Sequence, residues 1–282
     1  MKFLSRFYIG IIFFILYAPI LVVMLFSFNA SGSLSEFTGF SLYWYRDLFR
    51  NGEALQALKN SLILAVASSL AATALGTLAA FAIARTKSRR KQKLMEGVAN
   101  IPMMNPDIVT GVSMMLLFVG VGAMLRLDDT LGFWTMLLAH TTFNLPYVIL
   151  SVLPKFRQMD KSLTEAALDL GCTPAQTFLR VELPSILPGV VSGLMMGFTL
   201  SLDDFVISHF VSSPDFKTLP LYIYNQTAHE VKFSMYALCT LMIVTILLLL
   251  IAVNLAGSMG EGRRKGKGKG RGRALQKGGL AP

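Results

Sequence analysis

The segment FTLSLDDFVISHF, residues 198–210, places two carboxylates side by side in an apolar and aromatic run. Carboxylates within a membrane-spanning segment are costly, and they mostly face a bundle interior or a water-filled cavity. Such acids suit a cationic solute, because carboxylates and aromatic faces replace the water that an ammonium group sheds. We therefore predict a cation path lined by acidic and aromatic side chains: Asp203, Asp204, Phe198, Phe205, Tyr222 and Tyr224.

The two acids need not act together. Adjacent residues of a helix point about 100° apart, and Asp203 lies about 22 Å along the axis from Pro188, in the outer half of a membrane. One acid is expected to line the path while the other bonds a neighbouring helix or subunit. An intramembrane aspartyl protease needs carboxylates on separate helices that share a proton, and its Gly-x-Gly-Asp segment is absent. We predict no catalytic residue and no metal site.

The elements that carry these residues are membrane helices. The chain has 282 residues, of which 54% are hydrophobic and 15% are charged. This composition is far from that of a soluble domain. Six runs are long enough to span a bilayer, which predicts an all-α polytopic membrane protein. They cover residues 7–28, 60–84, 98–123, 131–153, 186–211 and 234–256.

Charge placement predicts the orientation of these spans. The net charge is +10, and most of the 26 Lys and Arg residues fall in 1–6, 85–97, 154–185 and the tail. All four segments lie on one side of a six-span topology, so the positive-inside rule places both termini in the cytoplasm. Topology explains the basic excess without nucleic acid, and the 85–97 run suits contact with anionic membrane lipid.

The chain divides into three predicted parts. Residues 1–59 hold the first span, interpreted as a retained helix rather than a cleaved signal, and an external loop with an aromatic belt at Tyr43, Trp44 and Tyr45. Residues 60–256 form a core of five spans. Residues 257–282 form a basic, Gly-rich tail, which we expect to be disordered and cytoplasmic.

Several polar residues have structural interpretations. Pro102 and Pro106 predict a kink or break at the start of the third span. Asp107 follows, either as an interfacial acid or as a polar residue facing a pathway or partner subunit. His140 and Asn144, four residues apart, are expected to be internal polar contacts. Cys172 and Cys239 lie in different parts of the topology and predict no disulfide.

The sequence of the connection at 155–185 predicts two short helices. Ser162 and Glu165 have the spacing of a capping box, and Gly171 stands where a glycine ends a helix. Thr173 and Pro174 then provide an N-cap and a first-turn proline for a second helix. We expect a compact helix–turn–helix in the cytoplasm, suited to contact with a soluble partner.

The same loop resembles the Glu-Ala-Ala loop of ATP-binding-cassette importer permeases. Glu165-Ala166-Ala167, Gly171, Val181 and Leu183-Pro184 match the spacing of that motif, with Val181 in place of the usual Ile. The resemblance implies the MetI-like fold of type I importers, in which this loop docks on the ATPase. The implied coupling residues are those of the first helix and its end: Glu165, Ala166, Ala167, Asp169 and Gly171. Glu165 can cap a helix and still serve in docking.

The chain carries no G-x-x-x-x-G-K-[ST] phosphate-binding loop. ATP and Mg²⁺ are therefore expected on a separate ATPase, and this chain is predicted to bind no cofactor and to be a transport subunit rather than an enzyme. Segments 16–31, 103–118, 140–148 and 198–224 are similar to permeases of spermidine/putrescine importers. That resemblance implies a sister permease, two ATPase copies, an external polyamine-binding protein and the bacterial inner membrane.

Two other functions use the same architecture or the same acids. Related permeases carry ferric ion, sulfate, molybdate or phosphonates. An anion importer would be expected to place basic groups centrally, and the predicted spans carry no Lys or Arg there. A channel is the second alternative, but a channel does not need a coupling loop.

Overall fold

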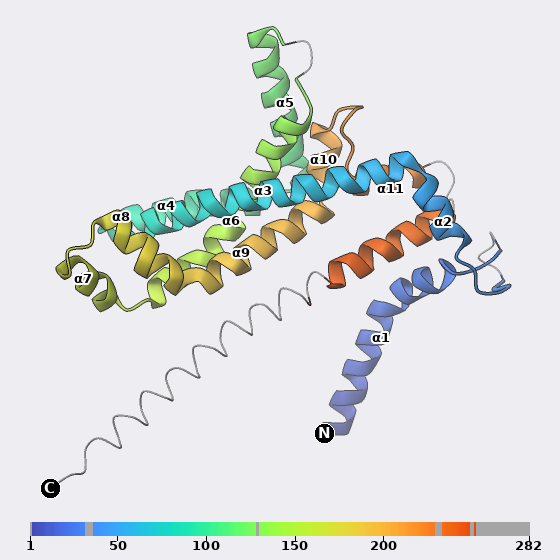
Figure 1. Ribbon diagram of the computed structural model, residues 1–282, viewed down its shortest axis with the longest axis horizontal. Helices are drawn as coiled ribbons and strands as arrows, with labels where there is room; N and C mark the ends of the chain where they lie inside the picture. Colours follow the sequence, from blue (N-terminus) through green and yellow to red (C-terminus); the bar gives the residue numbers. More distant parts are fainter. Residues whose placement is uncertain (1, 32–35, 128–129, 229–232, 249–250, 252–282) are drawn as a thin grey trace.

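A computed structural model describes residues 2–31, 36–127, 130–228, 233–248 and 251, and within these ranges the chain is helical (Figure 1). Short pairings Asn29–Phe40 and Ser213–Phe216 are isolated bridges. The helices are α1 (Lys2–Phe26), α2 (Tyr43–Arg50), α3 (Gly52–Arg85), α4 (Arg89–Met104), α5 (Asp107–Leu125), α6 (Phe133–Gln158), α7 (Lys161–Asp169), α8 (Pro174–Thr177), α9 (Leu183–Asp203), α10 (Val206–Val211) and α11 (Leu219–Thr227), with a π-helical turn η1 (Phe178–Glu182) between α8 and α9.

Five helical stretches are long and apolar enough to cross a membrane. A shorter apolar helix, Phe233–Leu248, follows α11. These correspond to the six predicted spans and make the chain a multi-pass membrane protein. The remainder of the sixth predicted span, 249–250 and 252–256, and the tail 257–282 lie outside the described residues. The five long stretches are Arg6–Phe26, Gly52–Arg85, Asp107–Leu125, Phe133–Gln158 and Pro174–Asp203.

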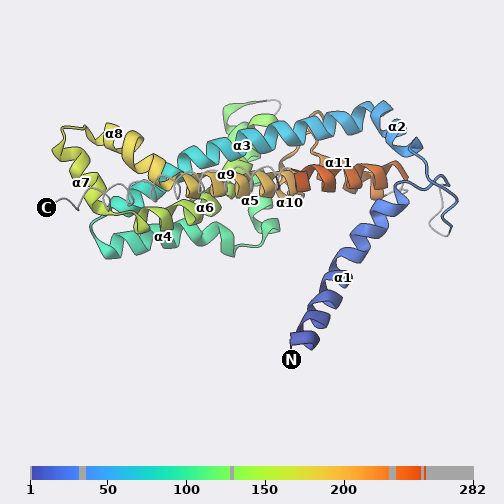
Figure 2. The ribbon, with the colours of Figure 1, turned by 60° about the horizontal axis from the view of Figure 1, so that its bottom comes forward.

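The centre of the fold is a bundle of α3, α6 and α9, which lie side by side in both ribbon views (Figures 1 and 2). Glycines at four-residue spacing on α9, Gly189, Gly193 and Gly197, face α6. A methyl group built on Gly189 would lie 2.9 Å from the carbonyl oxygen of Ser151, so the two backbones meet there. Small residues at this spacing let membrane helices approach closely, because lipid offers no hydrophobic gain for association.

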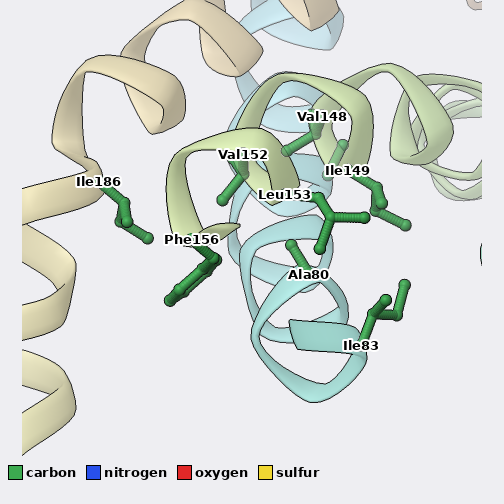
Figure 3. Close-up of a cluster of buried hydrophobic side chains, with 9 residues drawn as sticks. Ala80, Ile83, Val148, Ile149, Val152, Leu153, Phe156 and Ile186 are labelled. Carbon is green, nitrogen blue, oxygen red and sulfur yellow. The ribbon is translucent and has the colours of Figure 1, made fainter. Parts of the chain in front are cut away.

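One half of the bundle holds the cluster of apolar side chains in Figure 3. It joins α3, α6 and the first turns of α9 through buried side chains. Phe156 and Ile186 point toward one another there, and Leu153 lies above Ala80 of α3 (Figure 3). Packing of this density leaves few voids between the ends of the three helices.

Helix α1 stands apart from the bundle in both views (Figures 1 and 2). None of its membrane-length window is buried within this chain. Helix α2 holds the chain just after the end of α1: Trp44 Nε1 donates to the carbonyl oxygen of Asn29 at 2.8 Å, and the Ser27 and Tyr45 hydroxyls lie 2.8 Å apart. Two of the three predicted belt aromatics thus anchor α1 to α2, and a membrane-interface role stays a prediction.

Two of the predicted spans are interrupted. The third is divided at Asn105 and Pro106, which are extended and separate α4 from α5. This agrees with the predicted proline break, although Pro102 remains inside α4. Asp107 is exposed in the first turn of α5, where a negative charge favours a helix N-terminus. The fifth span, predicted to be continuous over 186–211, is interrupted at the aspartate pair.

Candidate functional site

The aspartate pair lies where α9 ends. Asp203 is the last residue of α9, and Asp204 is extended, with φ −68° and ψ 121°. This break gives the two carboxylates different surroundings. Asp203 is exposed on the single chain, whereas the side chain of Asp204 is only 7% exposed.

The carboxylate of Asp204 is hydrogen-bonded to the helix that follows it, α10. It accepts hydrogen bonds from the backbone N–H groups of Ile207, at 3.3 Å, and Ser208, at 2.8 Å. These are free donors of the first turn of α10, so Asp204 acts as a cap for that helix. His140 Nε2 on α6 lies 3.5 Å from its Oδ2. Asp204 therefore joins α9, α10 and α6.

A chain of buried polar side chains continues from His140 through the bundle. His140 Nδ1 lies 2.8 Å from Ser201 Oγ, and Ser201 Oγ lies 2.9 Å from Ser68 Oγ on α3. On the other side of the ring, Nε2 lies 3.3 Å from Ser208 Oγ. His140 is an internal polar contact, as the sequence predicts. Asn144 is also fully buried, and its amide has no hydrogen-bond partner within the described part of the chain.

The predicted aromatic residues lie in three different surroundings. The rings of Phe205 and Tyr224 lie 4.5 Å apart, and His209 packs on both at 5.4 Å and 6.1 Å. Tyr224 is half exposed, so this group, two residues from Asp203, reaches the surface. Tyr222 is buried among apolar side chains of α2, α3 and α11. Its hydroxyl accepts a hydrogen bond from Asn51 at 3.0 Å. Phe198 is half-buried on α9.

The second candidate region is the hairpin formed by residues 160–182. The predicted helix is present as α7, but the predicted capping box is wrong. Asp160 is the N-cap, and its carboxylate accepts from the backbone N–H of Ser162 at 3.0 Å. This bond holds the pKa of Asp160 below its ordinary value of 3.8. Asp160 precedes Ser162 and is the stronger acceptor, so α7 begins at Lys161 and Ser162 already lies within it.

The end of α7 and the start of α8 follow the prediction. Gly171 has φ +82°, a left-handed conformation that glycine adopts without steric cost. Thr173 caps α8 through its hydroxyl, which accepts from the Gln176 N–H at 3.3 Å, and Pro174 occupies the first turn. The second helix is not separate, however. It runs through η1 into α9, so Pro174–Asp203 is one continuous helical stretch.

The residues predicted to couple are mostly on the surface of the hairpin. Glu165, Ala166, Asp169 and Gly171 are exposed, whereas Ala167 is buried. Several leucines of the hairpin are exposed as well, and Leu170 is 86% exposed. Exposed leucines on a hairpin of this kind suit contact with another protein. The others are Leu163, Leu168 and Leu179.

Sequence reasoning missed several residues that the fold brings together. Ser201 contacts His140, and Ser68 contacts Ser201, from helices far away along the chain, so no local spacing in the sequence predicts these contacts. The four-residue spacing of Phe205 and His209 is the one local signal that predicts their contact. Within the described ranges, no group of three or more His, Cys, Asp or Glu side chains is placed to hold a metal ion.

Solved structures with this arrangement are membrane transport components. A bacterial ABC transporter involved in the import of the acidic polysaccharide alginate has a chain with a TM-score of 0.72 at 17% identity, covering 92% of this chain and 95% of that one. The MetNI methionine ABC transporter gives 0.61 at 16%, covering 73% and 95%. At these identities the likeness concerns the fold, which is the MetI-like fold of ABC importer permeases.

A match to a family model adds the role to this fold: the chain is a permease subunit, a transport component rather than an enzyme. Residues 72–257 match the family model described as "Binding-protein-dependent transport system inner membrane component", and the chain belongs to this family. Among its relatives is the putrescine transport system permease protein PotI of Escherichia coli K12, 38% identical over 231 residues and 82% of each chain. The spermidine/putrescine permease PotC of Haemophilus influenzae is 39% identical over 249 residues, 88% of this chain and 94% of the relative.

Proposed function

We propose that this chain is a polyamine permease, one of two membrane subunits that form the path for putrescine or spermidine in an ABC importer. The observation that carries the proposal is the similarity of at least 38% to PotI and PotC over more than four fifths of this chain. The exposed acid Asp203 precedes Phe205 of the aromatic group by two residues, and acidic and aromatic side chains both suit a cationic cargo.

The geometry favours Asp203 over Asp204 as the acid that contacts the cargo. Asp204 already accepts two backbone hydrogen bonds and lies beside His140, whereas Asp203 is exposed at the end of α9. The half-exposed ring of Tyr224, which packs at a tilt against Phe205, offers a cation–π face. In this proposal Asp203, Phe205 and Tyr224 line the path. Phe198 contributes from the same helix as Asp203, and Tyr222 supports the outer packing.

The hairpin is the proposed docking element for an ATPase. Its exposed face carries Glu165, Asp169 and the leucines named above, and ATP and Mg²⁺ would be held by the ATPase alone. Both termini and the hairpin would then be cytoplasmic, in agreement with the charge distribution. A sister permease would complete the path, and an external binding protein would deliver the polyamine.

An uptake assay tests the cargo. The complete complex, reconstituted in proteoliposomes with ATP on the hairpin side, should accumulate radiolabelled putrescine or spermidine. The other polyamine should compete, whereas sulfate, molybdate and ferric ion should not. Competition by one of these solutes, without competition by polyamines, would contradict the proposed cargo and leave the permease architecture intact.

A further inference from the structure

Glu182 is a buried carboxylate at the junction of the hairpin and the membrane bundle. It is the last residue of η1, immediately before α9, and it is only 1% exposed. One of its oxygens, Oε1, accepts a hydrogen bond from Thr164 Oγ1 of α7 at 3.0 Å. The same oxygen pairs with the guanidinium of Arg85 at the end of α3. A single atom thus contacts both the hairpin helix and a membrane-spanning helix.

The surroundings of this contact are tightly packed. The Arg85 guanidinium lies 5.1 Å from the ring centroid of Phe81, one turn earlier on α3. The Phe81 ring packs against Phe178 of η1 at 4.8 Å and against Phe156 of α6 at 5.9 Å. This group adjoins the apolar cluster of Figure 3, in which Phe156 is drawn beside Ile186. Arg85 is therefore positioned by aromatic contacts as well as by charge.

The connectivity of the hairpin makes this contact mechanically important. A displacement of the second helix passes directly into α9, because α8, η1 and α9 are continuous. Along the backbone, helix α7 is joined to that stretch through the Gly171 turn and to α6 through Met159 and Asp160, whereas α3 is separated from α7 by a long stretch of chain. Movement of α7 can reach α3 only across side-chain contacts. A π-helical turn often marks a functional position in a helix, and here it carries Glu182.

We infer that Glu182 is a positioning residue that ties α7 to α3, so that a push on the hairpin moves the end of the second membrane span. This inference rests on the proposed docking of the hairpin to an ATPase. If the contact only stabilised the fold, its loss would lower stability without affecting the response of α3 to ATP. The test therefore measures that response.

Thr164→Val is the informative variant. Valine keeps the branched shape of threonine and removes the hydroxyl that donates to Glu182, while the pairing of Glu182 with Arg85 remains. Thr177→Val is the matched control. Thr177 lies on the other helix of the hairpin, and its buried hydroxyl has no hydrogen-bond partner among the described residues. Glu182→Gln is a second variant, which keeps the side-chain shape and removes the charge.

The readout is the distance between α3 and α6 in the complete complex. Spin labels replace the exposed Leu78 and Leu150 after Cys172 and Cys239 are changed to serine. Pulsed electron paramagnetic resonance with and without ATP then reports the population of the ATP-dependent state, whatever the cargo. With ATP bound, Thr164→Val should lower the ratio of the ATP-dependent state to the ATP-free state about tenfold. This is the change expected from loss of one hydrogen bond to a charged group. Thr177→Val should match the unsubstituted complex, and the ATPase should co-purify with both.

The outcomes separate this inference from the function on which it rests. An ATP-dependent shift that is unchanged in Thr164→Val and Glu182→Gln would overturn the role of Glu182 and leave the docking proposal standing. Loss of the ATPase from the Thr164→Val complex would overturn it as well, since the hydroxyl would then shape the docking surface. Failure of the unsubstituted chain to recruit any ATPase, or to show any shift, would overturn both.

Discussion

The close contact between α6 and α9 gives a quantitative prediction for Gly189→Ala. The new methyl group would lie 2.6 Å from Lys155 Cγ and 2.9 Å from the Ser151 carbonyl oxygen. The lysine side chain can move, but the backbone oxygen can move only if the helices separate. Overpacking of this kind costs about 1–3 kcal/mol. The gain in helix propensity from glycine to alanine is about 1 kcal/mol and acts in the opposite direction.

Gly120→Ala is the control that isolates the packing effect. Gly120 lies inside α5, and a methyl group there would meet nothing within 4 Å. Both substitutions share the propensity gain, so Gly189→Ala should be less stable than Gly120→Ala by about 1–3 kcal/mol. Unfolding of the purified chain in detergent, followed by circular dichroism, measures the difference. Equal stability of the two variants would refute the close contact of α6 and α9.

Three further predictions concern the hairpin and the aspartates. Gly171→Val forces a branched side chain into φ +82° and should release the ATPase from the complex while the chain still inserts in the membrane, as co-purification would report. Asp203→Asn should reduce polyamine uptake without changing stability. Asp204→Ala should lower stability by about 0.5–2 kcal/mol through loss of the α10 cap. The reverse pattern would contradict the assignment of Asp203 to the path and of Asp204 to the cap. The lowered pKa of Asp160 means that its contribution to stability is present above pH 3.8 and is lost as the pH falls through the lower folded-state value. Unfolding midpoints of the wild type and Asp160→Asn should therefore change in parallel from pH 8 to pH 5, and the wild type should lose stability relative to the variant only below about pH 4.

Much of the architecture could be predicted from local sequence. Long apolar runs have one stable form in a bilayer, because every backbone polar group must be satisfied within the segment. Gly171, Thr173 and Pro174 also define local geometry, since positive φ, hydroxyl capping and a fixed proline φ depend on neighbouring backbone alone. The cap of α7 was missed because Asp160 and Ser162 both suit the position, and only the observed helix start decides between them.

The candidate site was harder to predict because its members come from different helices. Two adjacent acids in an apolar run predict a functional or structural role, but sequence cannot distinguish Asp203 from Asp204. The break after α9 decides which aspartate is available, since Asp204 caps α10 and approaches His140, whereas Asp203 stays exposed. The contact of Asp204 with His140 of α6 joins segments that no spacing within 198–210 relates.

The sequence by itself therefore determined the membrane spans, their orientation preference and the presence of a helical hairpin with its glycine turn. These follow from hydrophobicity, charge placement and backbone preferences that act over a few residues. Only the tertiary structure decided which aspartate is available, which tyrosine is buried, and that Glu182 joins Thr164 to Arg85. Each of these depends on contacts between segments far apart in the chain. Such contacts contribute to stability only when α3, α6 and α9 have packed together.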